Sequence, residues 1–348
     1  MNEDRTNDAS DRQRTTGRRS FVRATVAGTA LVGGSGVVAG KPGRSGNVPG
    51  EKGGGNGNGT GGGKGFPPNG TTEYGDSVGL GDGEVRTFTT ETPSGNPKYH
   101  GVEFDRSALD GLPSADDLGA AIDGETDGYD DKYGEAGEAL VVHRRSSLEF
   151  FVPFPDAEET PFTFLGLNWN PEGHPGGKGA WSKPHFDVHF HTLETDVIDP
   201  IEGPKLPPYD EIPDERIPEG YNRSPPPLAD ERYITDMGEH LAPGDAPELP
   251  DGPDDDADPD AFTNTLIQGF VGVDEGGDDL GDVPRLAFIE PMITREFLRD
   301  HSGTENDTVP QPEEYPYDEP THHPTGYAVR DVPARDAVVV TIREFEAV

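Results

Sequence analysis

The sequence contains no cysteine. Disulfide bonds are therefore excluded as a source of stability, and thiolates are excluded as ligands of any metal ion. A metal site in this chain has to be built from the side chains of histidine, aspartate and glutamate and from water. The chain contains ten histidines, and carboxylates are abundant.

Positive charge is scarce: 28 lysines and arginines stand against 67 aspartates and glutamates. The first 40 residues hold six of the basic and four of the acidic residues, which leaves 22 basic and 63 acidic residues and a net charge of −41. Nucleic acids and anionic membranes would be repelled, so neither is expected as a partner. In molar salt the Debye length falls to about 3 Å, and this charge balance is typical of a protein from a salt-loving microbe.

Several catalytic signatures are also missing. The chain has no Gly-x-Ser-x-Gly nucleophile motif and no His-Glu-x-x-His motif. The glycines of 53–65 precede no strand–helix unit, so they do not form a phosphate-binding loop. These absences weigh against a hydrolase of the common serine or zinc-protease types and against a nucleotide-binding enzyme.

Long hydrophobic runs are absent as well. The apolar run from Ala24 to Ala39 is rich in glycine and short for a membrane span. It follows Arg18-Arg19-Ser20-Phe21, which is typical of a twin-arginine export signal. We therefore expect a signal peptide over 1–40, a secreted or cell-surface protein, and no membrane span after cleavage, with an uncleaved signal anchor as the alternative. Residues 41–78 are glycine-rich and are predicted to form a flexible linker.

The remaining residues, 79–348, are predicted to form a single β-rich domain. Its apolar segments are short and separated by clusters of glycine, proline and aspartate, which predicts an all-β fold with little helix, a sandwich or barrel of short antiparallel strands. Insertions rich in proline and aspartate interrupt the pattern at 200–227 and 241–259. The predicted strands are Val85–Thr90, Tyr99–Phe104, Ala139–Arg144, Leu148–Pro153, Phe162–Trp169, His185–Leu193, Thr263–Val271, Arg285–Glu290 and Ala337–Phe345. The predicted helical segments are Ser107–Leu112, Ala115–Ile122 and Ile293–Asp300.

The strongest functional signal is the segment Pro184–His191, which reads Pro-His-Phe-Asp-Val-His-Phe-His. In a strand, successive side chains point to opposite faces, so three histidines and Asp187 form one row and the apolar residues form the other. Neutral imidazole and carboxylate are ligands of zinc, iron, manganese and copper. The row therefore predicts a metal site, and the alternative is an exposed polar face in contact with water.

Four other places offer ligand chemistry. His174 ends the segment Trp169–His174, and Glu290 ends an apolar strand, where a buried carboxylate would need a partner. The remaining places are His240, in the segment Met-Gly-Glu-His, and the pair His322-His323 in a proline-rich stretch predicted to be a loop.

Four of these segments together resemble a family of uncharacterised secreted prokaryotic proteins. That family carries Trp-Asn-Pro-x-Gly-His, then Pro-His-Phe-Asp-Phe-His-Phe, then Met-Gly-x-His and Glu-Pro-Met-(Val/Ile)-Thr. The resemblance extends from about Val85 to Val348. No activity is established for the family, so the resemblance implies none for this chain. The resemblance implies that six residues of this chain are positions of the family's motifs. At position 191, where this chain has His191, the family usually has tyrosine. The motif positions are His174, His185, Asp187, His189, His240 and Glu290.

The row and the resemblance together lead to one predicted site. We expect His185, His189, His240 and Glu290 to bind one divalent ion, zinc in the first place, with iron, manganese and copper as alternatives. Asp187 is expected to orient an imidazole from outside the site. The residues in reserve for that role, or for a fourth ligand, are His174 and His191.

Two classes of function remain after these exclusions. The first, favoured because the catalytic signatures are missing, is a non-catalytic binding or envelope protein whose partner is a small ligand or another envelope component. The second is a secreted metalloenzyme of hydrolytic, hydrating or cupin-like oxygen chemistry. The cupin comparison rests on His189, His191 and Glu194, which resemble the His-x-His…Glu pattern with a gap one residue short.

Overall fold

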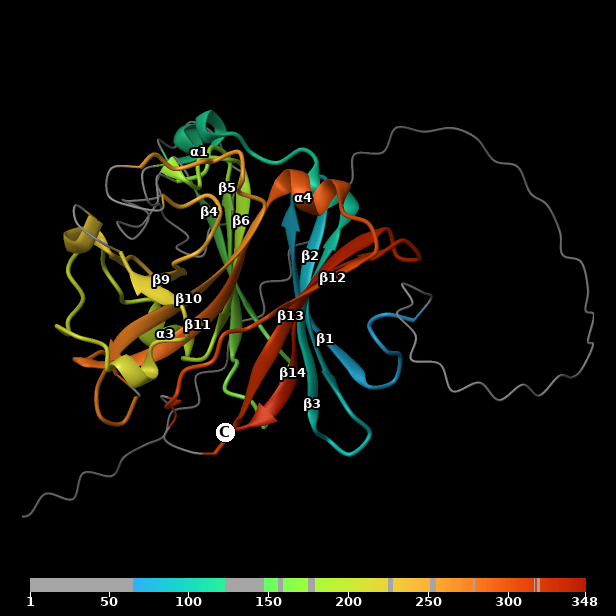
Figure 1. Cartoon of the computed structure of the whole chain (residues 1–348). Coiled ribbons are helices and arrows are strands. Elements are labelled where there is room, and N and C mark those ends of the chain that lie inside the picture. The colour runs from blue at the N-terminus through green and yellow to red at the C-terminus, as the bar shows by residue number, and fades with distance from the viewer. Residues whose placement is uncertain are drawn as a thin grey trace, which may run out of the picture. The chain divides into compact units, whose positions relative to one another are not determined.

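The computed structural model describes residues 65–122, 147–155, 159–174, 179–224, 228–250, 255–277, 279–315, 317 and 320–348. These residues are mostly β-strand and form two antiparallel sheets with few helices (Figure 1). The predicted β-rich fold is confirmed, and the arrangement is that of a sandwich. The predicted signal peptide, the first part of the predicted linker (41–64) and the predicted strand Ala139–Arg144 lie outside the described residues.

The first sheet, sheet A, has six strands in the order β1-β2-β3-β14-β13-β12. It combines the two ends of the described chain, because the C-terminal strand β14 pairs with β3. Its strands are β1 (Thr72–Leu80), β2 (Gly83–Glu91), β3 (Pro97–Asp105), β12 (Thr304–Thr308), β13 (His322–Val332) and β14 (Ala337–Ala347).

The second sheet, sheet B, has the order β4-β5-β6-β11-β10-β9-β7, and the short strand β8 also pairs with β9. The strand that carries the predicted metal row, β6, lies inside this sheet between β5 and β11. The strands are β4 (Leu148–Pro153), β5 (Phe164–Asn170), β6 (His185–His191), β7 (Tyr221–Arg223), β8 (Tyr233–Ile234), β9 (Gly238–Pro243), β10 (Asn264–Val273) and β11 (Val283–Thr294).

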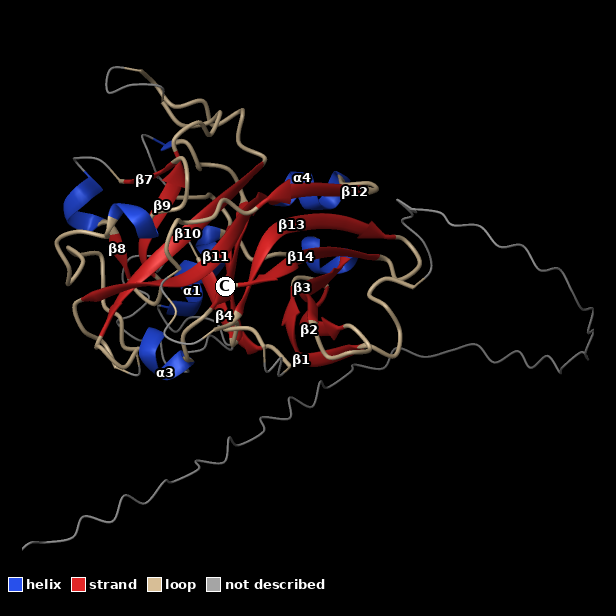
Figure 2. Ribbon diagram, turned by 60° about the horizontal axis from the view of Figure 1, so that its bottom comes forward, coloured by secondary structure: helices blue, strands red, loops and turns tan. Residues whose placement is uncertain are grey.

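Helical segments are short and lie in the connections between strands (Figure 2). Among the described residues, no helix is long and apolar enough to span a membrane. The helices are η1 (Arg106–Leu109), α1 (Ala115–Ile122), α3 (Thr195–Ile198), η3 (Asp214–Arg216), η4 (Leu228–Glu231) and α4 (Arg295–Asp300).

The main hydrophobic core lies between the facing sheets. It contains the inward side chains of β6, namely Phe186, Val188 and Phe190, all fully buried. The ring of Phe186 meets the ring of Phe104 on β3 edge to face, with centroids 5.4 Å apart. Burying a side chain of this size stabilises the fold by about 1.5–3 kcal/mol, so the apolar side chains of β6 help to hold sheet B against sheet A.

Some element boundaries differ from the predicted ones. Strand β1 begins at Thr72, inside the predicted linker, because an edge strand can keep polar and glycine residues on its solvent side. The helix predicted from Ile293 begins at Arg295, because β11 continues to Thr294 and the Thr294 hydroxyl accepts a hydrogen bond from the amide of Phe297. Pro291, expected near a helix start, lies inside that strand.

Strands β12 and β13 are absent from the prediction. Strand β12 contains no apolar residue, and β13 begins with His322-His323-Pro324, which reads as a loop. The structure places both histidines in sheet A, where they pair with the end of β14. They therefore lie in a different sheet from β6.

Candidate metal centre

Strand β6 places a row of ionisable side chains on the face of sheet B that points away from sheet A. Alternate residues from His185 to His191 form this row, and the residues between them belong to the main core. The three imidazoles and the carboxylate of Asp187 are at most 4 % exposed. The predicted one-sided row is confirmed, and the alternative of an exposed polar face is wrong.

A second hydrophobic cluster covers this outer face. Val197, Ile198 and Tyr209, from the connection between β6 and β9, pack with Phe164 of β5 and Phe288 of β11. In both overall views this connection lies on the side of sheet B away from sheet A (Figures 1 and 2). A polar group buried in such a layer costs free energy unless it has a partner, so the row requires partners.

The strand register decides which side chains the row meets. On β5, Gly166 pairs with His189 and Asn170 pairs with His185. On β11, the register puts Glu290 opposite His189. Strand β11 therefore places a carboxylate beside the row. Strand β5 places an amide beside it, and a glycine that leaves space above the sheet.

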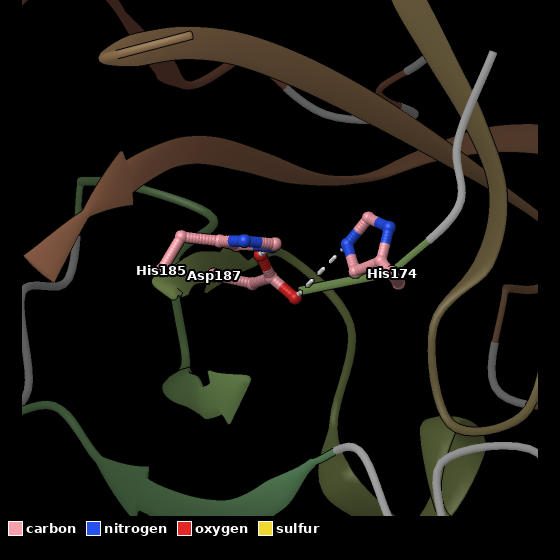
Figure 3. A group of neighbouring side chains, drawn as sticks. All are labelled: His174, His185 and Asp187. Atoms are coloured by element: carbon pink, nitrogen blue, oxygen red, sulfur yellow. Dashed lines mark ion pairs between the residues drawn. The ribbon is translucent and has the colours of Figure 1, made fainter. Parts of the chain in front are cut away.

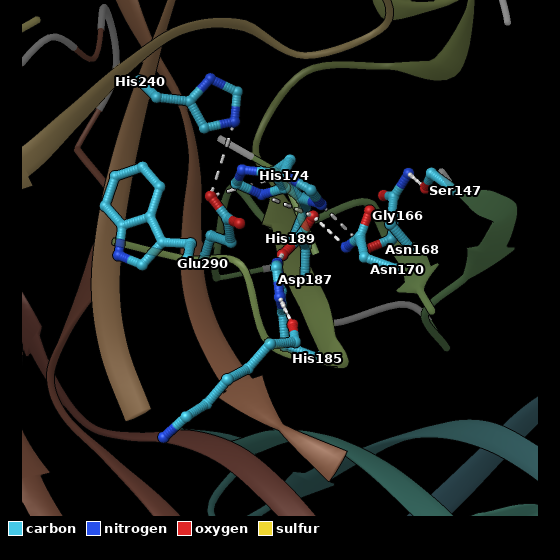
Figure 4. A network of polar contacts seen from close by, with 12 residues as sticks. Ser147, Gly166, Asn168, Asn170, His174, His185, Asp187, His189, His240 and Glu290 are labelled. Carbon is cyan, nitrogen blue, oxygen red and sulfur yellow. Dashed lines mark hydrogen bonds and ion pairs between the residues drawn. The ribbon is translucent and has the colours of Figure 1, made fainter. Parts of the chain in front are cut away.

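Three side chains from three strands converge to form what we call the Glu290 group: His189 of β6, His240 of β9 and Glu290 of β11 (Figure 4). Nε2 of His189 and Nε2 of His240 each lie 3.6 Å from Oε2 of Glu290. Atoms that share one ion at about 2.0–2.2 Å in a tetrahedral arrangement are about 3.3–3.6 Å apart. The two measured distances therefore fit one shared ion. The side chain of His240 is 23 % exposed, so the group reaches solvent on one side.

The hydrogen bonding of this group leaves metal-binding atoms available. Nδ1 of His189 lies 3.2 Å from the carbonyl oxygen of Gly166, which makes Nδ1 the protonated nitrogen and leaves a lone pair on Nε2. Among the described residues, neither this Nε2 nor Oε2 of Glu290 has a hydrogen-bond partner, although both atoms are buried. A cation bound between these two atoms would satisfy both of them.

The pKa values of the group are shifted by burial. Burial lowers the pKa of His189 to about 4, so its imidazole is neutral at pH 7. Burial, and then the negative charge of Asp187, raise the pKa of Glu290 well above its usual range. A cation at the same place would favour the carboxylate form.

A second set, which we call the Asp187 group, consists of His174, His185 and Asp187 (Figure 3). Nε2 of His185 lies 3.1 Å from Oδ1 of Asp187, and Nε2 of His174 lies 3.7 Å from Oδ2. The amide of Asn170 donates a hydrogen bond of 2.8 Å to Oδ2. Burial acts to raise the pKa of Asp187, but the imidazole of His185, and then that of His174, hold this pKa well below its usual range.

The ring of Phe288 packs against the histidines of the Glu290 group. Its centroid lies 4.7 Å from that of His189 and 5.1 Å from that of His240. Phe288 pairs with Gly269 of β10, where a Cβ atom would lie 1.9 Å from Cζ of the ring. Glycine at position 269 therefore makes the space that the ring occupies.

The structure separates one of the four residues predicted to share an ion. His189, His240 and Glu290 lie together, but His185 lies in the Asp187 group. His185 and His189 are four residues apart on one strand, so their Cα atoms are about 13 Å apart. Alternation places both on one face, but that separation is too long for one ion.

The other predicted residues have different surroundings from those expected. Asp187, expected to orient an imidazole from outside a site, contacts two imidazoles directly, and the reserve residue His174 is one of them. The other reserve, His191, stacks on Phe164 with ring centroids 4.3 Å apart. His191 and Glu194, the residues of the cupin comparison, belong to neither group found among the described residues.

Sequence reasoning missed the groups that hold the ligands in position. They are the amide of Asn170 and the backbone carbonyls of Gly166 and Lys183, which bind the Nδ1 atoms of the two β6 histidines. Asn170 stands inside the motif that contains His174, and this was the available signal. The carbonyls have no side-chain signal, because their role follows from the register.

Comparison with known proteins adds no relationship to this description. No family model matches the chain, and none of the curated proteins and none of the solved structures matches it. The functional conclusion therefore rests on the geometry of the two groups.

Proposed function

We propose that this protein binds a divalent metal ion at the Glu290 group, through His189, His240 and Glu290. The observation that supports this most directly is the position of two imidazole nitrogens, each 3.6 Å from the same buried carboxylate oxygen. Two imidazoles and one carboxylate are a common ligand set of zinc and of non-haem iron. Zinc is the expected ion, and iron, manganese and copper accept the same ligands.

A purely structural role explains this geometry less well. Hydrogen bonds from nitrogen to oxygen are usually 2.7–3.2 Å long, which the two 3.6 Å separations exceed. A buried polar atom left without a hydrogen bond costs about 1–3 kcal/mol. Side chains placed only for stability would close these gaps, whereas a bound ion requires them.

The favoured role is metal-dependent binding of a small ligand in the cell envelope. Three protein ligands leave at least one coordination position for an outside oxygen or nitrogen atom. The partly exposed side chain of His240 puts this position near solvent. The same feature favours a metalloenzyme as the second candidate, since an ion with an open position also lowers the pKa of bound water.

Elemental analysis of the mature protein, purified in high salt from cells grown with all four metals, tests the proposal. We expect at least one equivalent of a single transition metal and a lower melting temperature after treatment with a chelator. At a free-ion concentration 100 times Kd, binding stabilises the folded state by about 2.7 kcal/mol. A protein without metal, whose melting temperature none of the four ions raises, would contradict the proposal.

We also propose that the protein is exported by the twin-arginine route, which carries folded proteins and so permits metal loading before export. The support is Arg18-Arg19 with the apolar run that follows, and an acidic surface suited to high salt. Changing both arginines to lysine should leave the precursor in the cytoplasm, as measured by cell fractionation and immunoblotting. The matched control changes Arg12 and Arg14 in the same leader and should be secreted normally. Secretion of both variants at the wild-type level would rule out this route.

A further inference from the structure

We propose that the Asp187 group is a second divalent-ion site, separate from the Glu290 group. Its ligands are His174, His185 and Asp187, which offer the same two imidazoles and one carboxylate. This site is defined by the geometry of these three residues and of the segment that positions His174. It does not require an ion at the Glu290 group.

The two buried side chains of this group, His185 and Asp187, point toward each other. His185 is held by Nδ1, which lies 2.6 Å from the carbonyl oxygen of Lys183, so Nε2 points toward Asp187. Nε2 lies 3.1 Å from Oδ1 of Asp187, close enough for a direct ion pair, and neither atom has a hydrogen bond of good geometry among the described residues. The amide of Asn170 holds the other oxygen of Asp187. Two atoms oriented in this way are suited to ligating one ion.

The third ligand is delivered by a tight turn. After β5, the amide of Gly173 bonds to the carbonyl of Asn170, and the amide of His174 bonds to the carbonyl of Trp181. Gly173 has a φ of +70°, and a Cβ atom there would lie 2.2 Å from the oxygen of Trp181. Only glycine fits this position. The segment from Trp169 to His174 therefore brings both the amide that orients Asp187 and the second imidazole.

The two groups follow the same plan. Each has a fully buried imidazole on β6 whose Nδ1 contacts a backbone carbonyl, and each has a buried carboxylate. Each also has a second imidazole from another segment, His174 or His240, whose side chain is 23 % exposed. Asp187 and His189 are neighbours in the row, about 6.5–7 Å apart between Cα atoms, so each ion has its own set of ligands.

The experiment counts ions in matched variants. The metal-stripped mature protein is dialysed against Zn²⁺ in molar KCl, which screens the acidic surface, and bound zinc is measured by elemental analysis. We expect two ions in the wild type, one in His174→Gln, one in His240→Gln and none in the double variant. His174 and His240 are equally exposed, so the two substitutions carry a similar risk to folding. The control, His322→Gln, changes a histidine of sheet A that is 27 % exposed and should keep both ions.

The number of ions bound by each variant distinguishes the proposed Asp187 site from the proposed Glu290 site. A single ion that is kept in His174→Gln and lost in His240→Gln would overturn the second site and leave the Glu290 site in place. A single ion with the opposite pattern would support the Asp187 site and remove the Glu290 site. If His174→Gln does not fold, the wild-type count and the ion remaining in His240→Gln decide the question.

Discussion

Replacing Glu290 by glutamine is expected to remove tight metal binding at the Glu290 group with little effect on the metal-free fold. Glutamine keeps the shape of the side chain but has no anionic oxygen for the ion. Changes to groups around a metal typically cost 10–100-fold in affinity, and the loss of a ligand should cost at least about 100-fold. Because burial raises the pKa of Glu290, it favours the neutral carboxyl form when no cation is bound, and the neutral amide is a close substitute for that form. Zinc affinity, compared with and without the change in protein that also carries His174→Gln so that the Asp187 group does not bind, and the melting temperature with and without zinc measure both effects.

The matched control is Glu103→Gln in sheet A. Glu103 is also a buried carboxylate, but Arg86 and Arg335 bind it, and it belongs to neither metal group found among the described residues. This variant should be less stable than the wild type, because two arginines lose their charged partner, and it should bind zinc normally. Unchanged zinc affinity in Glu290→Gln would show that Glu290 is not a ligand.

The metal row was predictable because it depends on local backbone geometry alone. Alternation along β6 puts three histidines and Asp187 on one face whatever the strand pairs with. The apolar residues between them identify the face that joins the core, and Phe186 and Phe190 are fully buried there. Since this information is contained in a segment of a few residues, the strand and its two faces follow from the sequence.

The grouping of the ligands was not predictable in the same way, because it depends on the strand order. His189 meets Glu290 because β11 lies beside β6, and His240 joins them because β9 lies two strands further on. These pairings connect segments far apart in the chain, and no local pattern specifies them. The distance between His185 and His189, in contrast, could have been calculated from the strand rise, which excludes one shared ion.

The outer layer was the least predictable part of the fold. The insertion at 200–227 is rich in proline and reads as a loop, yet Ile201 and Tyr209 are buried against sheet B. Isolated apolar residues in an irregular segment carry no periodic signal. Whether the row faces solvent or a covered layer therefore had to come from the structure.

Replacing Gly269 by alanine is expected to weaken metal binding without changing any ligand. The added Cβ atom would lie 1.9 Å from Cζ of Phe288, so the ring that packs against His189 and His240 has to move. Overpacking of this kind costs about 1–3 kcal/mol of stability. A shift of the ring also removes the contact that holds the two imidazoles, and we expect zinc affinity to fall by about 10–100-fold, as for other supports of metal ligands.

Sheet A contains a control with the same geometry, since Gly101 pairs with Phe88 and a Cβ atom there would lie 2.1 Å from Cζ of that ring. Gly101→Ala should therefore lose a similar amount of stability in urea unfolding, while its zinc affinity, measured by titration in molar KCl, stays at the wild-type value. Equal losses of affinity in both variants would mean that general destabilisation weakens binding. Normal affinity in Gly269→Ala would mean that Phe288 does not hold the imidazoles. A loss confined to Gly269→Ala is the result that the packing of Phe288 against the Glu290 group predicts.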